Sequence, residues 1–164
     1  SLGARTINEA IGSRLQDWEA SGVALLWQTG VAFATRAKEL CAGHSFPHWS
    51  DAFIQRMDLA YGLADVVISR AGASAISELC LLGKPTILVP SPNVAEDHQT
   101  KNALALSLRG AAILIPDADA RRDLTALALV ADEPARRALS EEILRLALPS
   151  AADRIVDEIE SLVP

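Results

Sequence analysis

Several polar side chains that could bind a small ligand fall within residues 64–103. Gln99 and Asn102 are three positions apart, so they would share one face of a helix. Each amide offers both a hydrogen-bond donor and an acceptor, which suits the vicinal hydroxyls of a sugar. His98 adjoins Gln99, and Glu78 lies on the preceding predicted helix. These residue types indicate a polar binding site for which a sugar is a suitable ligand.

The pattern around these side chains predicts a βαβ unit extended by one helix. Its elements are a strand at 66–68, a turn of small residues at 69–74, a helix from about 75 to 82, a strand at 86–89, a polar loop, and a helix near residue 98. Gly83 ends the first helix, and Pro85 prevents it from continuing. Parallel sheets bind ligands at the carboxyl ends of their strands, where both polar turns lie. The free N–H groups that begin the first helix favour a phosphate there.

The rest of the chain alternates strands and helices in the same way, which predicts an α/β fold with a Rossmann-like doubly wound parallel sheet. Further strands are predicted at 23–27, 48–53 and 111–115, and helices at 6–20, 31–41, about 55–64, 123–130, 133–146 and 151–162. Val23–Trp27 is almost continuously apolar, as parallel strands buried on both faces are. At 164 residues, a single domain spanning 1–164 is expected.

Composition excludes several classes of function. The chain is 50% apolar with a net charge of −6, whereas a general nucleic-acid binder shows a basic face. It has no apolar run of the ~20 residues that span a bilayer and no signal-peptide pattern. Cys41 and Cys80 lie in helical patterns and are interpreted as reduced thiols. We therefore expect a soluble cytoplasmic chain. Since it begins at Ser1, inside a predicted turn, we also expect a fragment of a longer protein.

The candidate metal ligands have structural explanations. His44 and His48 flank a loop and are assigned no acidic or thiol partners, so we interpret them as solvent-facing. Asp117-Ala118-Asp119 spells DxD, a spacing that binds a metal ion in one class of glycosyltransferases. Here it follows a strand and opens toward a helix, so capping carboxylates explain it better. We predict neither a metal nor a cofactor.

An ordered set of short motifs gives the chain a family resemblance over nearly all its length. The motifs are Leu26-Trp27-Gln28-Thr29-Gly30, Ala64-Asp65-Val66-Val67-Ile68-Ser69-Arg70, Gly72-Ala73, Ser77-Glu78, Gly83-Lys84-Pro85, Val89-Pro90, Asp97-His98-Gln99 and Asn102-Ala103, with the opening Ser1-Leu2-Gly3-Ala4-Arg5. With them the chain resembles the nucleotide-sugar half of the MurG family of bacterial N-acetylglucosaminyltransferases. The resemblance implies the C-terminal half of a GT-B glycosyltransferase, a nucleotide-sugar-binding domain that lacks its N-terminal acceptor domain.

The resemblance also implies roles for particular residues. It places Ser1, Gly3, Gly72, Ala73, Ser74 and Ala75 near the donor phosphates, the backbone of Ile54 on the uracil edge, Glu78 on the ribose hydroxyls, and His98, Gln99 and Asn102 at the substrate. Other interpretations stay open: a frayed terminus at Ser1, a core role for Ile54, an acid that favours a helix N-terminus at Glu78, and an exposed His98.

One position departs from the family pattern, because Ser74 followed by Ala75 stands where relatives can place a threonine hydroxyl against the phosphate. Ser74 or backbone amides could substitute for it. Arg70 could approach the phosphate from the strand end or form a structural ion pair. His98 is the only candidate for a catalytic base near this site, and we assign it instead to substrate contact or loop positioning. The resemblance implies that the family's proposed base lies in the other domain.

The implied activity is inverting transfer of N-acetylglucosamine from UDP-N-acetylglucosamine to the lipid-linked muramyl-pentapeptide in peptidoglycan synthesis. The acceptor would bind through the missing N-terminal domain, and the full-length protein would lie peripherally on the inner face of the cell membrane. The isolated domain is expected to be inactive. The alternatives are the donor-binding domain of another GT-B sugar-nucleotide enzyme, such as an epimerase or a stand-alone donor subunit, and a non-catalytic doubly wound regulatory module.

Overall fold

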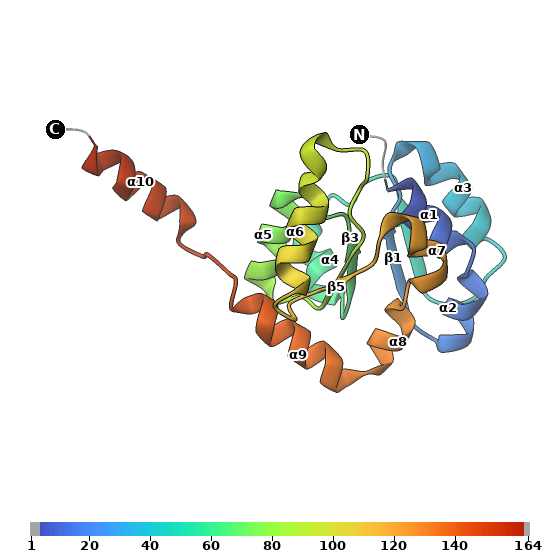
Figure 1. Ribbon diagram of the computed structural model, residues 1–164. Helices are drawn as coiled ribbons and strands as arrows, with labels where there is room; N and C mark the ends of the chain where they lie inside the picture. The colour runs from blue at the N-terminus through green and yellow to red at the C-terminus, as the bar shows by residue number, and fades with distance from the viewer. Residues whose placement is uncertain (1–3, 163–164) are drawn as a thin grey trace.

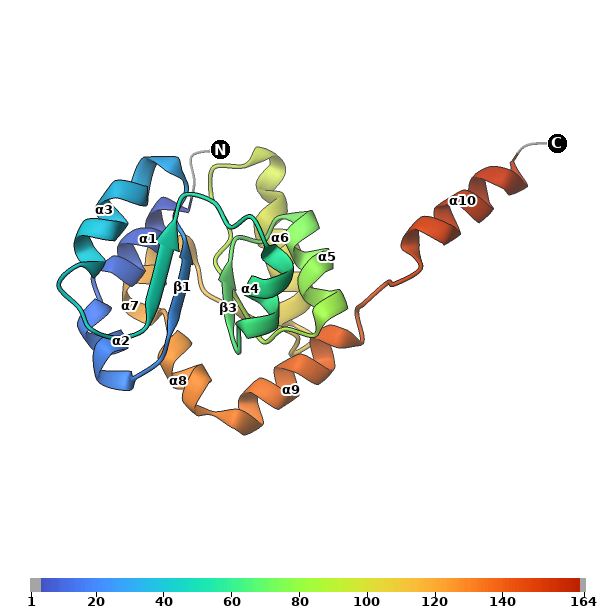
Figure 2. The same ribbon diagram turned by 180° about the vertical axis from the view of Figure 1, so that it is seen from behind.

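The computed structural model describes residues 4–162, and two parallel sheets form its centre. One sheet pairs β1 (Leu25–Gln28) with β2 (His48–Asp51). The other has the order β3 (Val67–Ser69), β4 (Thr86–Leu88) and β5 (Ile113–Leu114). Helices α1, α2, α3 and α7 gather around β1, and α4, α5 and α6 gather around β3 (Figures 1 and 2). The predicted parallel α/β fold is confirmed.

The helices follow the predicted order with some changes in their bounds. They are α1 (Arg5–Gly12), α2 (Leu15–Ser21), α3 (Val31–Cys41), α4 (Met57–Leu63), α5 (Ala73–Leu82), α6 (His98–Ser107), α7 (Ala120–Asp123), α8 (Ala126–Ala131), α9 (Glu133–Leu144) and α10 (Ala151–Ser161), with 3₁₀ turns η1 (Ala95–Asp97) and η2 (Asp117–Asp119). The single helix predicted at 6–20 is wrong. The chain forms two helices there, and at the break between α1 and α2 the Ser13 hydroxyl donates to the carbonyl of Ala10 at 3.0 Å.

The sheet is divided between β1 and β3, and we call this division the seam. Within residues 4–162 no strand ladder joins β1 to β3. A doubly wound sheet with the strand order 3-2-1-4-5-6 has its first strand in the middle. Here β2 and β1 lie on one side of the seam and β3, β4 and β5 on the other, so the seam lies at the position of that middle strand. The prediction that 23–27 is buried throughout is wrong, because Leu26 is 41% exposed while Leu25 and Trp27 are buried. Because successive side chains of a strand face opposite sides, one face of β1 is buried and the other is partly exposed.

Strand β4 lies between two layers of apolar side chains. Ile87 packs in a cluster with Ile7, Ile11 and Trp27, on the side of α1 and β1. Leu88 points the other way and packs in a second cluster that includes Leu79 of α5. Since successive side chains of a strand face opposite sides, one strand supplies both cores. Helices on both faces of this strand therefore fix the position of its carboxyl end.

His44 is not the solvent-facing loop residue that the sequence predicts. Its Nδ1 lies 2.7 Å from Oε2 of Glu19, and only 18% of its side chain is exposed. The other carboxylate oxygen of Glu19 accepts from the hydroxyl and the N–H of Ser45, at 2.7 and 2.8 Å. These bonds, led by the hydroxyl of Ser45, lower the pKa of Glu19 to about 2. The contact fastens the loop before β2 to helix α2.

Helix α10 projects away from the two sheets (Figures 1 and 2). None of its residues is buried, and Ile155 and Ile159 are 61% and 57% exposed. Across residues 4–162, no helix has the length and apolarity that crossing a membrane requires.

Gly83 provides a test of the turn that ends α5. It adopts the left-handed region with φ 59° and ψ 34°, and an added Cβ would lie 3.4 Å from Oγ of Ser140. We predict that Gly83→Ala lowers the free energy of unfolding by about 1–2 kcal/mol, measured by urea denaturation. The matched control is Gly62→Ala in α4, where no atom lies within 4 Å of the added Cβ. That variant should be about 0.5–1 kcal/mol more stable than wild type. Equal shifts in both variants would contradict the argument.

Candidate functional site

The first turn of α5 is open to a ligand. Gly72 is the N-cap in an extended conformation, and no side chain caps the helix. Helix α5 starts at Ala73, two residues earlier than predicted, so Ala73, Ser74 and Ala75 form its first turn. The backbone N–H groups of a first turn have no partner within the helix, and the helix dipole adds positive potential there. The predicted phosphate turn therefore has the donors that an anion needs.

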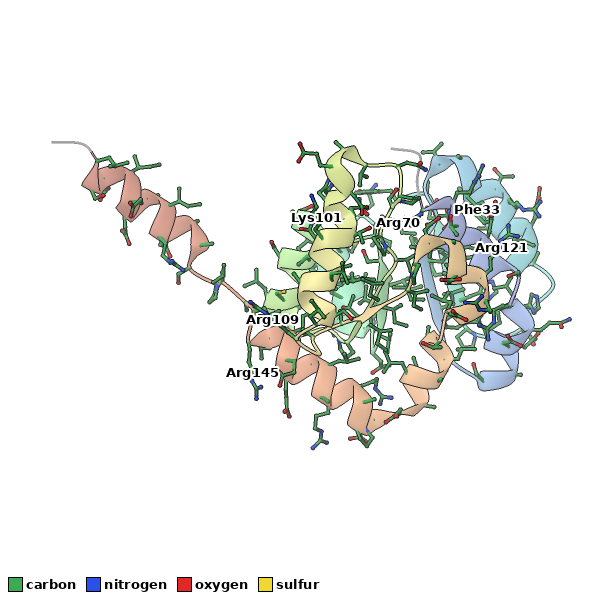
Figure 3. All side chains as sticks on the ribbon, viewed as in Figure 1. Phe33, Arg70, Lys101, Arg109, Arg121 and Arg145 are labelled. Atoms are coloured by element: carbon green, nitrogen blue, oxygen red, sulfur yellow. The ribbon has the colours of Figure 1, made fainter. Side chains whose placement is uncertain are left out.

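Arg70, labelled in Figure 3, directly follows β3, and its side chain reaches the exit of β4. Its Nη1 donates to the carbonyls of Val89 and Pro90 at 3.0 and 3.2 Å, and it forms an ion pair with Asp117. Oδ2 of Asp117 accepts from the hydroxyl of Thr6 at 2.9 Å. Of the two roles that the sequence left open for Arg70, the structure shows the ion pair.

The interpretation of Asp117 and Asp119 as helix caps is wrong. Neither carboxylate accepts a capping bond at the start of η2 or α7. Asp117 instead binds Arg70 and Thr6, and Asp119 pairs with Arg122 at 2.9 Å. Arg70 and Thr6 are distant from Asp117 in the sequence, and Arg122 lies three positions after Asp119, so the DxD motif alone does not indicate these partners. In the described part of the chain, no group of three or more His, Cys, Asp or Glu residues could hold a metal ion.

Gln99 and Asn102 hold the two polar turns against α6. Oε1 of Gln99 accepts from the N–H of Ser91 at 2.9 Å, which anchors the loop that follows β4. Nδ2 of Asn102 donates to the carbonyl of Ala71 at 3.1 Å, which anchors the turn that precedes α5. The predicted shared helical face thus reaches both turns. These bonds use one end of each amide, and the predicted contacts to a sugar would use Nε2 of Gln99 and Oδ1 of Asn102.

His98 begins α6 and is exposed, as one of its two predicted interpretations requires. Its Nδ1 lies 2.8 Å from the carbonyl of Ala95, so Nδ1 carries the proton. In the neutral ring, Nε2 is then the free acceptor. Glu96 and Asp97 just before it have φ values of 54° and 52°, which is uncommon for residues other than glycine. Such backbone strain concentrates at ligand sites.

Glu78 faces helix α4 from the side of α5. Its Oε2 accepts from the hydroxyl of Tyr61 at 3.0 Å, and the carboxylate is exposed. Burial, followed by the hydrogen bond and charge of Glu78, raises the pKa of Tyr61 to about 12. A shallow hollow of about 310 Å³ lies between the two helices. It is lined by Met57, Asp58, Tyr61, Glu78, Leu81 and Leu82. Since the first turn of α5 contains no acid, the alternative of a helix-terminus carboxylate is wrong for Glu78.

Ile54 lies between β2 and α4, and its N–H donates to Oε1 of Gln28 at 2.9 Å. It is only partly buried and belongs to neither core cluster, so the alternative core role is wrong. The predicted uracil contact would require the Gln28 side chain to move aside or to share this N–H. The predicted phosphate contacts Ser1 and Gly3 lie outside the described residues.

Sequence reasoning missed the supporting role of four side chains at the predicted site: Thr6, Gln28, Tyr61 and Asp117. Gln28 had a local signal, because it ends a strand at the edge where ligands bind. Thr6 and Asp117 are 111 positions apart, and Tyr61 and Glu78 are 17 apart on different helices, so no local pattern marks either pair.

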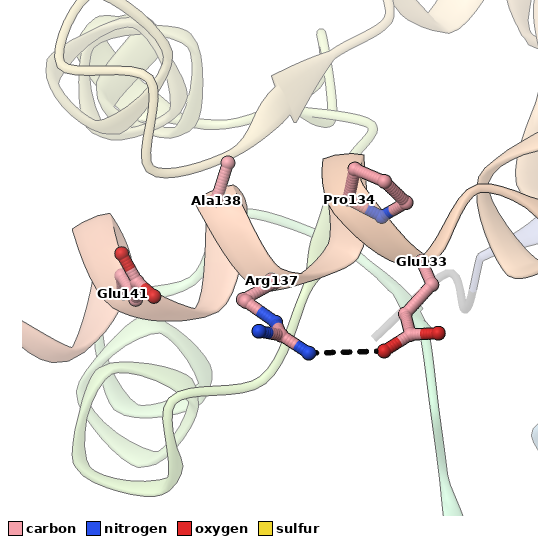
Figure 4. Close-up of a pocket in the computed structure, with 5 residues that line it drawn as sticks. All are labelled: Glu133, Pro134, Arg137, Ala138 and Glu141. Atoms are coloured by element: carbon pink, nitrogen blue, oxygen red, sulfur yellow. Dashed lines mark hydrogen bonds and ion pairs between the residues drawn. The ribbon is translucent and has the colours of Figure 1, made fainter.

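A larger hollow of about 470 Å³ lies along one face of α9 (Figure 4). It is lined by Glu133, Pro134, Arg137, Ala138 and Glu141. All of these residues belong to one helix and are exposed, and the Glu133–Arg137 pair at 3.0 Å is open to solvent. A binding site normally encloses its ligand between elements, so the edge formed by β3, β4 and α5 is the stronger candidate.

Comparison with known proteins agrees with this geometry. A family model described as the glycosyltransferase family 28 C-terminal domain matches residues 1–155. A UDP-N-acetylglucosamine--N-acetylmuramyl-(pentapeptide) pyrophosphoryl-undecaprenol N-acetylglucosamine transferase of Porphyromonas gingivalis strain W83 is 60% identical over 99% of this chain and 44% of its own length. The protein of the same name from Bacteroides thetaiotaomicron is 48% identical over 99% of this chain and 45% of its own length.

Two solved structures are similar in fold. The crystal structure of Acinetobacter baumannii MurG matches with a TM-score of 0.77 and 25% identity, over 93% of this chain and 48% of that one. A glycotransferase of kitacinnamycin matches with a TM-score of 0.60 and 20% identity, over 86% of this chain and 43% of that one, which concerns the fold alone. The chain spans less than half the length of the relatives that it matches.

The contact between Tyr61 and Glu78 can be tested by alkaline titration. Tyr61 is the only tyrosine, so phenolate absorbance reports this residue alone. We predict a midpoint near its pKa of about 12, and a lower midpoint in Glu78→Gln, because the carboxylate then neither accepts the proton nor repels the phenolate. The midpoint should stay above 10, since burial, the largest cause, remains. Asp58→Asn, in the same hollow, is the control. An unchanged midpoint in Glu78→Gln would show that the two side chains are apart in solution.

Proposed function

The chain belongs to the glycosyltransferase family 28 C-terminal domains, and on that premise we propose that it is the donor-binding half of an inverting N-acetylglucosaminyltransferase. The donor is UDP-N-acetylglucosamine, and the acceptor is the lipid-linked muramyl-pentapeptide of peptidoglycan synthesis. Relatives at 60% and 48% identity carry the name of this transferase, which supports the proposal.

The arrangement along α5 is the observation that carries the proposal. Its uncapped first turn offers N–H donors to a diphosphate, and these donors also stabilise the negative charge that develops on the departing UDP. Ser74 and Glu78 are four positions apart, so they lie on the same face, ~6 Å apart along the axis. A nucleotide with its diphosphate at the helix start therefore brings its ribose hydroxyls toward the carboxylate of Glu78. The free Oε1 of that carboxylate is an acceptor for them.

With the diphosphate at the start of α5, the side-chain amides of Gln99 and Asn102 in α6 are placed to bind the donor sugar. Gln99 and Asn102 stand beside the two turns that would surround the sugar and diphosphate, and each keeps one polar atom that does not bind a turn. His98, with Nε2 as an acceptor, is placed to contact the substrate from the start of α6. The uracil edge would pair with the backbone of Ile54.

Catalysis requires the remainder of the protein. Transfer needs an acceptor hydroxyl aligned with the anomeric carbon and a base that removes its proton. We assign acceptor binding and the base to an N-terminal domain outside residues 1–164, and the inner face of the cell membrane as the place where the whole enzyme acts. The relatives are more than twice as long as this chain, which supports this division. No observation favours an epimerase, a stand-alone donor subunit or a regulatory module.

The role of Glu78 can be tested with two nucleotides. By calorimetry, Glu78→Gln should weaken binding of UDP more than binding of 2′-deoxy-UDP, because the lost charge-assisted bonds go to the ribose hydroxyls. The difference for UDP should be about 1.5–3 kcal/mol. Glu141→Gln, an exposed change on α9, is the control and should affect neither ligand. Equal weakening for both nucleotides would remove Glu78 from the ribose site.

A separate prediction concerns which donor residues 1–164 bind and whether they transfer the sugar without the N-terminal domain. UDP-N-acetylglucosamine should raise the melting temperature of residues 1–164 more than UDP-glucose or GDP-mannose does. The same chain should transfer no sugar to a lipid-linked muramyl acceptor, and addition of the N-terminal domain should restore transfer. Equal stabilisation by all three donors would oppose the assigned substrate, and transfer by residues 1–164 alone would make His98 the candidate base.

A further inference from the structure

A chain of polar contacts runs beneath the first turn of α5. Arg70 immediately precedes the turn Ala71–Gly72, and its Nη1 reaches the carbonyls of Val89 and Pro90 at the exit of β4. The same nitrogen pairs with Asp117, whose other carboxylate oxygen binds the hydroxyl of Thr6 in α1. The segments after β3, β4 and β5 are thus tied to one another and to a helix on the far side of the seam.

This ion pair is largely removed from water. The side chains of Arg70 and Asp117 are 20% and 18% exposed. Nε of Arg70 is buried and has no partner among the described residues. A desolvated pair seldom adds stability compared with apolar side chains of similar volume, because removing two charges from water offsets their attraction. The pair instead fixes the geometry of the backbone, because Nη1 of Arg70 lies beside acceptors on two segments, the exit of β4 and Asp117, and holds both next to the end of β3.

We propose that Arg70 and Asp117 are positioning residues for the donor diphosphate. The inference rests on the proposed function, and it assigns no contact between Arg70 and the ligand. The pair holds the start of α5 against the exit of β4 and against α1, and the bond from Asn102 to the carbonyl of Ala71 holds the same turn from α6. The N–H groups of Ala73–Ala75 are therefore preorganised in the unliganded protein, so binding of the diphosphate costs no entropy for ordering this turn.

A direct contact between Arg70 and the diphosphate is the competing role. In the structure, Nη1 already faces two carbonyls and a carboxylate, and the charge of Asp117 cancels that of Arg70. A change at Thr6 can distinguish positioning by Arg70 from direct contact, because Thr6 binds Asp117 but carries no charge of its own. Thr6→Val removes one anchor of the pair at nearly constant volume. Under the positioning role this change weakens binding of the diphosphate, whereas under the direct role it does not.

The test measures the affinity of UDP and of uridine for wild type, Thr6→Val and Arg70→Lys by calorimetry. The control is Thr125→Val, the same substitution at an exposed position where the side chain makes no capping bond. We expect Thr6→Val to weaken UDP about threefold to tenfold and to change uridine less than twofold, with the control unchanged. Arg70→Lys should act in the same direction more strongly, because the shorter lysine side chain would not bring its ammonium to the position of Nη1, the nitrogen that makes all three contacts. Measurements below the melting temperature of every variant keep the folded states comparable.

The other outcomes are distinguishable. An unchanged UDP affinity in Thr6→Val, with a loss only in Arg70→Lys, would overturn the inference in favour of direct contact. A lower melting temperature with parallel losses for UDP and uridine would assign the pair a structural role only. If Arg70→Lys does not fold, Thr6→Val still decides. If wild type binds neither UDP nor uridine, the proposed function fails, and this inference fails with it.

Discussion

A single nitrogen, Nη1 of Arg70, meets acceptors from two other segments at the point where three strands end. Its bonds to Val89 and Pro90 and its pair with Asp117 converge on the carboxyl edge of the β3–β5 sheet. Carboxyl edges of parallel strands are followed by loops, which have no ladder to fix their course. Here the largely buried side chain of Arg70 holds the loops in place of ladder hydrogen bonds, so the candidate site is built on fixed backbone.

Helix α6 completes this base from the other side. Gln99 and Asn102 lie on one face and bind the loop after β4 and the turn before α5, respectively. The consequence for α5 is that its capless start is held by neighbouring elements rather than by its own side chains. A Ser, Thr or Asp cap would occupy the N–H groups that an anion requires. Neighbouring elements therefore stabilise the turn, and its N–H groups stay available to a ligand.

Local patterns in the sequence predict the order of elements, because apolar strands, Gly83 and the small-residue turn act over short distances. They also predict that Gln99 and Asn102 share a face, as the structure shows. They do not reveal that these amides bind backbone, that Asp117 meets Arg70 from 47 positions away, or that Leu26 is exposed. These features depend on which segments become neighbours in the fold. The apolar spacing over residues 6–20 likewise does not mark the break between α1 and α2.

The seam gives β1 and β3 the character of edge strands in the middle of a fold. Leu26 is 41% exposed, and all three residues of β3 are only partly buried, whereas all of β4 is buried. Natural proteins protect exposed edges with charges, prolines or bulges, because an unpaired apolar edge is a template for another chain. The segment Leu25–Leu26–Trp27 carries none of these. Within residues 4–162, the backbone edges of β1 and β3 at the seam are therefore open to pairing with a further strand.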